Sequence, residues 1–522
     1  MTPALNVVVA RVMNTKTQLA SVSATTFLVA ILLVNPNTRA MGAGVTVITH
    51  GLQVNNGYPA WLDDMGSAIV ARAGTTTAVI HLEVGHLNNG TVGITVFEKE
   101  SGLWPVEGST NAEVVVKLFW HTVAGLTDST TTTDVANLAV PYLLSPIIVG
   151  NQTNHPLAEM PIHLMGHSRG ASVATELSRL LAKSGIWVDQ VTTIDPHPIG
   201  ADGVVNIYDN VLFADNYFQL DNTGFFPISG EHVDGTAEEQ LTSLFDSDGI
   251  DDTGNFSDHI ETHDWYYGTI DLAATTASGD PLPRSIWYPF QYPFTYARGF
   301  QLSRIASGQW LRENAQLLGD FSGNGWKFAS APRNSGYTTS GPQWPNVFLE
   351  NTNAIWSVKA GQPLTLDLRY RDAFSSGYVT IDLGVDDDGS PYNNTLPTFF
   401  VTTTNAATGN TDWHGVRSWT PRIQDDGKFV YARITDANRL VRYYYLPNAF
   451  HVSAPAPFLS LQTIPGGKAL SVNGTVGVHY TVQVSTNLMT WSPFANFTAT
   501  NAITVIIDSG ILDRRFYRAV SP

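Results

Sequence analysis

The 522-residue sequence contains no cysteine, so it forms neither disulfide bonds nor cysteine-ligated zinc sites, and no thiolate acts as a nucleophile. Charge is also scarce, because Asp, Glu, Lys and Arg make up 14% of the chain, against roughly 25% in an average globular protein. Positive charge is the scarcer sign: 28 Lys and Arg stand against 45 Asp and Glu, a formal net charge of −17. Nucleic acids are bound through clustered Lys and Arg, so we expect no nucleic-acid partner.

The N-terminal segment lacks an apolar run long enough to cross a membrane comfortably, which takes about 20 residues. Its apolar run is Phe27 to Val34, preceded by Arg11 and Lys16 and followed by small residues on either side of Arg39. This arrangement resembles a secretory signal peptide. We therefore expect residues 1–40 to be a signal peptide and the protein to be secreted or held at the cell surface. A buried or disordered N-terminal segment is the alternative.

From Val45 to about Ser303 the sequence alternates short apolar β-type runs with helical candidates. The helix at Ala171–Lys183 is the clearer one, and the helix at Asp134–Leu144 is weaker because Pro141 interrupts it. Such alternation predicts a mostly parallel sheet with helices on both faces. The predicted strands are 45–49, 77–82, 113–120, 161–165 and 191–194.

Beyond about Ser303 the helical pattern fades, and alternating apolar and polar residues predict antiparallel sheets. Prolines at 453–457 favour an extended linker. We expect an α/β domain over 41–309, a β-sandwich-like domain over 310–452 and a small C-terminal β-domain over 458–522. The predicted fold class is α/β followed by two smaller all-β domains.

The stretch MPIHLMGHSRGASVATELSRLLAKSG, residues 160–185, places Ser168 between Gly166 and Gly170 at a strand-to-helix junction. A serine hydroxyl is a poor nucleophile unless a sharp turn presents it to a base and to donors for an oxyanion. An apolar strand before the serine, helical spacing after it and Gly185 as a helix stop favour a nucleophile elbow over an ordinary turn.

A serine nucleophile also needs an acid and a base, which follow it in that order along α/β-hydrolase chains. Asp195 directly follows an apolar strand and is the favoured acid, with Asp215 as its rival one strand later. His259 is the favoured base over His263 in the segment SDHIETHDWYYGTI. The plainer interpretation of each candidate is a turn aspartate or a structural histidine.

The oxyanion of such a reaction needs backbone N–H donors. The segment VTVITHGL ends one predicted strand with a glycine turn at Gly51. We expect the N–H groups of Leu52 and of Arg169, the residue after the nucleophile, to converge on one oxygen.

Five ordered segments over roughly residues 45 to 270 resemble the pancreatic and lipoprotein lipase type of α/β-hydrolase: HGL, VVVKLFW, GHSRGA, TTIDPHP and HIETHDWYY. The resemblance implies an α/β-hydrolase fold, the triad Ser168, Asp195 and His259, and lipid esters as substrates. The sequence departs from the family in having no disulfides and in placing Arg169 where an apolar residue is usual. A guanidinium there is expected to change acyl-chain preference. The family's C-terminal lipid-associated sandwich is not recognisable.

This chemistry requires no cofactor. His259, Glu261 and His263 do not form an HExxH motif and have no evident third ligand, so no metal site is predicted there. The acidic stretches 246–252 and 385–389 contain oxygen ligands that suit calcium, but neither has the spacing of an EF-hand loop. Solvated turns are the favoured interpretation of both.

The sequence thus predicts an exported serine carboxylic-ester hydrolase, with a lipase or lipid esterase as the leading hypothesis. One alternative is an esterase acting on acylated polysaccharide, whose C-terminal β-domains bind glycan. Another is a surface binding or adhesion protein with an inactive hydrolase domain.

Overall fold

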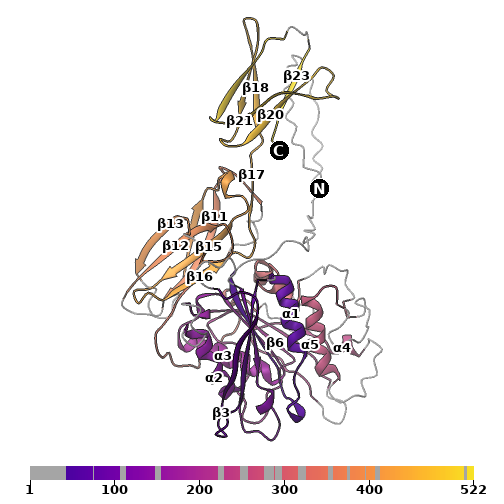
Figure 1. Cartoon of the computed structure of the whole chain (residues 1–522), viewed down its shortest axis with the longest axis vertical. Helices are drawn as coiled ribbons and strands as arrows, with labels where there is room; N and C mark the ends of the chain where they lie inside the picture. The colour runs from indigo at the N-terminus through magenta and orange to yellow at the C-terminus, as the bar shows by residue number, and fades with distance from the viewer. Residues whose placement is uncertain are drawn as a thin grey trace.

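The computed structural model describes residues 43–74, 76–105, 113–146, 155–221, 228–246, 257–274, 287–288, 297–315, 325–350, 357–372, 377–393, 396–405, 412–510 and 514–521. The predicted signal peptide lies outside these residues. Figure 1 shows three regions in chain order along the long axis: an α/β region, a first β-region and a C-terminal β-region. No helix in the described part of the chain is long and apolar enough to cross a membrane.

The α/β region is built around one eight-stranded sheet with the order β3-β2-β4-β1-β5-β6-β7-β8. Neighbouring strands pair in parallel except for β3, which pairs antiparallel with β2 at one edge. Strands β1, β4, β5, β6 and β7 are buried along their whole length, which explains the apolar residues on both faces of β1, β4 and β5. Strands β6 and β7 also carry buried polar side chains. The strands are β1 (Gly44–Thr49), β2 (Ala78–His86), β3 (Val92–Ser101), β4 (Glu113–Phe119), β5 (Ile162–His167), β6 (Val188–Ile194), β7 (Val211–Phe218) and β8 (Ala237–Gln240).

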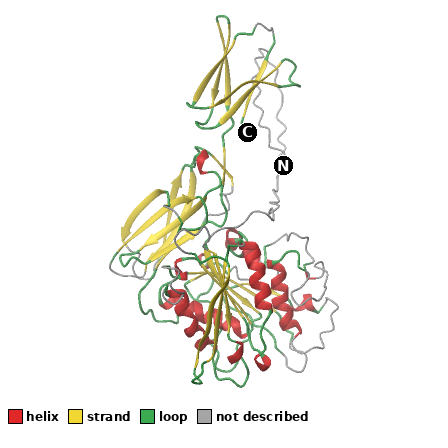
Figure 2. Ribbon diagram, viewed as in Figure 1, coloured by secondary structure: helices red, strands yellow, loops and turns green. Residues whose placement is uncertain are grey.

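Helices cover both faces of this sheet, as Figure 2 shows. Successive residues of a strand point to opposite faces, so Val47 packs in the core with α2 and α3, whereas Ile48 packs in the core with α1 and α5. The helices are α1 (Trp61–Ala73), α2 (Thr132–Leu144), α3 (Arg169–Lys183), α4 (Thr242–Phe245) and α5 (Ser257–Ile270). Short 3-10 helices lie at Val54–Asn56, His121–Val123, Leu157–Glu159, Gly299–Leu302, Gln309–Asn314, Lys327–Ala329 and Ile423–Asp425.

Two helix predictions have different outcomes. Helix α3 ends at Lys183 and is followed by Gly185 with φ 73°, which confirms the predicted stop. The predicted interruption at Pro141 is wrong, because α2 runs through this residue to Leu144. A capping box between Thr131 and Asp134 and a buried apolar face stabilise α2 despite the backbone hydrogen bond that proline cannot donate.

The two β-regions consist of small sheets. The first contains a three-stranded sheet β14-β11-β9, a four-stranded sheet β13-β12-β15-β16 and a parallel pair β10-β17. The C-terminal region contains two three-stranded antiparallel sheets, β18-β19-β22 and β21-β20-β23. The predicted fold class, α/β-hydrolase-type followed by smaller all-β regions, is confirmed. The strands are β9 (Pro345–Leu349), β10 (Ser357–Lys359), β11 (Leu364–Asp372), β12 (Tyr378–Asp386), β13 (Thr398–Asn405), β14 (Trp413–Trp419), β15 (Phe429–Thr435), β16 (Val441–Tyr445), β17 (His451–Ser453), β18 (Phe458–Ile464), β19 (Gly467–Asn473), β20 (His479–Ser485), β21 (Ser492–Thr498), β22 (Ile503–Asp508) and β23 (Phe516–Val520).

The first β-region is attached to the α/β region through buried polar contacts. Arg442 of β16 donates to the carbonyl oxygens of Trp187, at 2.9 Å, and Met160, at 3.0 Å. Asn346 of β9 donates to the carbonyl oxygen of Gly185 at 2.7 Å. These carbonyls lie just before β5 and β6, so this β-region meets the end of the sheet where those strands begin.

Candidate active site

Ser168 lies at the junction of β5 and α3 and is 4% exposed. Its backbone has φ 58° and ψ −128°, a conformation that residues other than glycine rarely adopt. Two glycines allow the turn by close approach. A β-carbon at Gly166 would lie 2.0 Å from the carbonyl oxygen of Gly170, and one at Gly170 would lie 2.6 Å from that of His50. The structure therefore has the strand, the strained turn and the helix of an elbow that presents a serine.

Asp195 follows β6, the strand next to β5, and so lies at the same edge of the sheet as Ser168. Its Oδ2 is 2.5 Å from Nδ1 of His259, in the first turn of α5. Asp195 is fully buried and His259 is 7% exposed. A carboxylate that accepts a hydrogen bond from Nδ1–H of a neutral imidazole fixes the tautomer in which Nε2 is unprotonated, and Nε2 can then take a proton from a hydroxyl.

Two residues that the sequence did not single out hold Asp195. Gln219, directly after β7, donates its backbone N–H to Oδ1 at 2.8 Å and its side-chain amide to Oδ2 at 3.0 Å. Gly230 lies so close that a β-carbon there would be 2.1 Å from Oδ1. Gln219 is the last residue of the run NVLFADNYFQ, which suggested Asp215 as a rival acid. The sequence therefore drew attention to this strand, but to Asp215 as an acid and not to Gln219 as a hydrogen-bond donor to Asp195.

The alternate acid and base have other surroundings. Asp215 lies within β7, and its buried carboxylate accepts hydrogen bonds from the side chains of Gln190, Thr192 and Tyr217. Burial raises the pKa of Asp215 to about 6. His263 stacks on Trp61, with ring centroids 4.4 Å apart and an interplanar angle of 11°. Among the described residues, the carboxylate that contacts His259 is that of Asp195.

His167, the residue before the serine, ties the elbow to α5. Its Nε2 donates to the backbone carbonyl of His259 at 2.7 Å, and the two rings are 4.5 Å apart. Burial holds the pKa of His167 well below its ordinary value, with smaller contributions from His259 and His263. A neutral His167 adds no positive charge beside His259.

The predicted oxyanion turn approaches Ser168 closely. A β-carbon at Gly51 would lie 2.4 Å from Cβ and 2.7 Å from Oγ of Ser168, so only glycine fits. His50 anchors the turn: its Nδ1 donates to the Gly51 carbonyl at 2.9 Å and its Nε2 accepts from the Trp120 N–H at 3.0 Å. Burial lowers the pKa of His50 to about 3, so the imidazole stays neutral and keeps one donor and one acceptor nitrogen. Leu52 follows directly, and Arg169 begins α3, where the first N–H groups lack intrahelical acceptors.

The side chain of Arg169 is bound within the protein. It is 4% exposed and pairs with both carboxylate oxygens of Asp202, at 2.7 and 2.8 Å. It also donates to the carbonyl of Ala124 at 2.8 Å. The guanidinium is therefore committed to internal acceptors, and its expected effect on acyl-chain preference stays a prediction.

Three carboxylates gather beside the start of α5. Asp221, Asp246 and Asp258 each place an oxygen within 4.8 Å of the others, an arrangement that can hold a cation. The sequence drew attention to Asp246, and the rest of that acidic stretch, 247–252, lies outside the described residues. Asp221 and Asp258 lie outside that stretch, and the sequence did not indicate that they would join Asp246. In the second acidic stretch, Asp388 caps a turn by accepting from the Ser390 N–H at 2.9 Å.

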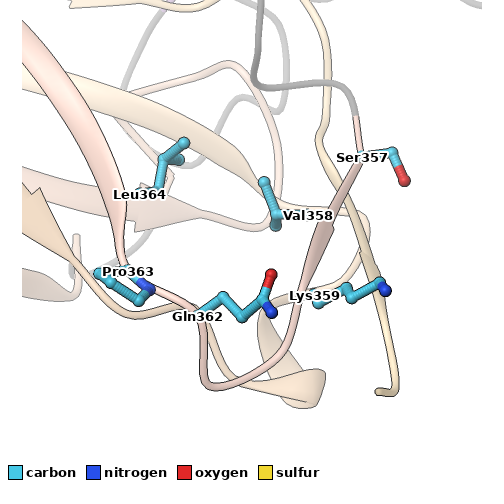
Figure 3. A pocket seen from close by; sticks show the side chains of 6 residues that line it. All are labelled: Ser357, Val358, Lys359, Gln362, Pro363 and Leu364. Carbon is cyan, nitrogen blue, oxygen red and sulfur yellow. The ribbon is translucent and has the colours of Figure 1, made fainter. Parts of the chain in front are cut away.

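A pocket of about 260 Å³ lies elsewhere, in the first β-region beside β10 (Figure 3). None of the predicted site residues lines it; its lining side chains are those of Ser357, Val358, Lys359, Gln362, Pro363 and Leu364.

Neither a family model nor a curated protein sequence matches the chain. Among solved structures, it is similar to the "putative cell surface hydrolase" of Lactobacillus plantarum, with 11% identity over 47% of this chain and 95% of that one and a TM-score of 0.27. It is also similar to superoxide reductase from Ignicoccus hospitalis, with 14% identity over 21% and 80% of the two chains and a TM-score of 0.15. A fragment of ICAM-5 has 13% identity over 34% and 45%, with a TM-score of 0.19. At these TM-scores the similarities carry no argument about activity.

Proposed function

We propose that this protein is a serine hydrolase of carboxylic esters that uses Ser168 as nucleophile, His259 as general base and Asp195 as the group that orients the base. The observation that carries the proposal is the 2.5 Å contact between buried Asp195 and His259, at the sheet edge where the strained Ser168 turn also lies. Strain at a buried turn persists only where the surrounding structure imposes it, and it gathers at functional sites.

In the proposed reaction, His259 Nε2 removes the hydroxyl proton as Ser168 Oγ attacks the ester carbonyl carbon. The N–H groups of Leu52 and Arg169 stabilise the resulting oxyanion. The tetrahedral intermediate collapses, the imidazolium protonates the leaving alcohol, and an acyl-enzyme remains. Water, deprotonated by the same imidazole, then releases the acid and restores Ser168.

The substrate class rests on the sequence resemblance to lipases, which favours lipid esters over acetylated polysaccharide. Export rests on the basic and apolar N-terminal pattern. The buried contact between Asp195 and His259 supplies the orienting carboxylate that an active base needs, which favours an active hydrolase over an adhesion protein that has lost its activity.

Labelling with a fluorophosphonate probe tests the nucleophile. We expect wild type to be labelled and Ser168→Ala not to be. Ser178→Ala is the matched control, because Ser178 lies on the same helix and donates to the Thr175 carbonyl, away from the turn. Folded wild type that resists labelling would refute the proposal.

Turnover of esters of graded acyl length then tests the substrate class. A lipase should turn over emulsified long-chain esters faster than acetate esters. A strict preference for acetate would contradict the lipid assignment and favour the polysaccharide esterase.

A further inference from the structure

The side chain that follows the nucleophile joins several separate segments. Arg169 donates to the carbonyl oxygens of Ala124 and Thr130, on the connection between β4 and α2, and to Asp202, beyond β6. The Asp202 side chain is 1% exposed. A buried pair of this kind costs desolvation, which only good geometry and further hydrogen bonds offset.

Those further hydrogen bonds are present around Asp202. Its Oδ1 accepts from the Thr132 N–H at 3.1 Å and its Oδ2 accepts from the Ile199 N–H at 3.0 Å. The Thr132 hydroxyl accepts from the Gly203 N–H at 2.9 Å. Asp202 is thus held by backbone groups on two sides, and it provides a fixed anchor for the Arg169 guanidinium.

The Arg169 guanidinium also contacts Trp120, and Trp120 contacts His50 in the predicted oxyanion turn, His50 to Leu52. Its Cζ lies 4.8 Å from the centroid of the Trp120 ring. That indole donates from Nε1 to the His50 carbonyl at 2.9 Å and stacks on the His50 ring, with centroids 5.4 Å apart. His50 immediately precedes Gly51 and Leu52, so the contacts run without a break from Asp202 to the oxyanion turn.

Two donors on different strand ends must meet one oxygen atom at about 2.7–3.1 Å each. Leu52 follows β1 and Arg169 follows β5, so their separation depends on how these two turns are held. We propose that Arg169, Asp202 and Trp120 are positioning residues that set this separation. Their side chains act through the backbone N–H groups of Leu52 and Arg169 and do not touch substrate. This inference rests on the proposed hydrolase function and adds the machinery that holds its oxyanion site.

The test compares Asp202→Asn, Arg169→Met and Trp120→Phe with Arg179→Met. Arg179 is the matched control because it lies on the same helix and pairs with Glu176 at 2.6 Å, away from Ser168. We measure kcat and KM per active site, counted by fluorophosphonate titration, and the affinity for a boronic acid that forms a tetrahedral adduct with the serine.

We expect the three site variants to lose about 10- to 100-fold in kcat with little change in KM, less than the loss on removing an oxyanion donor outright. Boronic acid affinity should fall by a similar factor, and Arg179→Met should match wild type. A purely structural role would instead lower the titrated fraction and leave kcat per site unchanged.

If Arg169→Met does not fold, the milder Asp202→Asn and Trp120→Phe decide the question, and kcat per site within about twofold of wild type in both would overturn the proposal. Failure of the hydrolase assignment itself is distinguishable, because wild type would then not be labelled at all.

Discussion

Buried polar groups make different contacts at the carboxyl ends and at the amino ends of the strands in the eight-stranded sheet. At the end where β5 and β6 finish, these groups hold irregular backbone, with φ 58° at Ser168 and φ 44° at Asp195. At the opposite end, ion pairs such as Arg312 with Asp189 lie against regular strands. There Arg442 also binds the first β-region to the α/β region. The first β-region therefore occupies the end away from the candidate active site, and we expect it to contribute stability rather than substrate contacts.

The largest expected effect is at the site end. Asp195→Asn should lower kcat by about 10³- to 10⁴-fold, because the imidazole loses the acceptor that fixes its tautomer. Asp215→Asn should leave kcat within about threefold of wild type, since Asp215 contacts other side chains within β6 and β7. Turnover of both variants, with circular dichroism to check folding, is the measurement. Loss of activity in Asp215→Asn alone would reverse the assignment of the acid.

At the opposite end, the expected effect is on stability. Arg442→Met leaves carbonyl acceptors of Met160 and Trp187 buried without their donor, so the free energy of unfolding should fall by about 3 kcal/mol. Arg422→Met is the control, because the Arg422 side chain is 68% exposed. Its free energy of unfolding should stay within about 0.5 kcal/mol of wild type. Urea unfolding measures both. A drop in kcat of folded Arg442→Met without a loss of stability would contradict the division of roles.

Between the two ends, Asp215 should make stability depend on pH. Its pKa is raised from 3.8 to about 6, so the folded state holds the proton more tightly than the unfolded state. Its contribution is therefore fully present below about pH 4 and is lost as pH rises through 6, by about 3 kcal/mol in all. Asp215→Asn, which stays neutral, should be about as stable as wild type at pH 4 and more stable at pH 7.5. The free energy of unfolding of both proteins at the two pH values is the measurement. The same difference between Asp215→Asn and wild type at pH 4 and at pH 7.5 would contradict the raised pKa of Asp215.

The smallest effect is expected for the C-terminal β-region. It has its own core, formed by Leu459, Leu470, Val472, Val482, Tyr517 and Ala519, and it meets the preceding region at a small cluster that includes Ile423 and Ala454. A chain ending at residue 457 should keep its kcat and melt within about 2 °C of the full chain's α/β transition, as measured by calorimetry. A larger fall in the melting temperature would show that the C-terminal β-region stabilises the α/β region.

The sequence was sufficient to predict what depends on neighbouring residues. Apolar runs identified β1, β4 and β5 because fully buried strands are mostly apolar on both faces. The predicted strand 191–194 covered only the second half of β6, whose first half contains buried Asp189 and Gln190. The pattern missed β3, which is half-buried along one edge and carries charged residues. Local propensity also misjudged Pro141, since packing of α2 against α3 outweighs one lost hydrogen bond.

At the candidate site, the residue types proposed for catalysis and their order follow from the sequence by itself: a serine in a glycine turn, an aspartate after a strand, a histidine later in the chain. Tertiary structure alone decided which aspartate meets His259, that Gln219 and Gly230 enclose it, and that Arg169 turns to Asp202. The reason is physical. Glycines at fixed spacing mark where a tight turn is sterically possible, and that signal is local, whereas a buried carboxylate is held by whichever donors the packed sheet and loops bring within hydrogen-bonding distance.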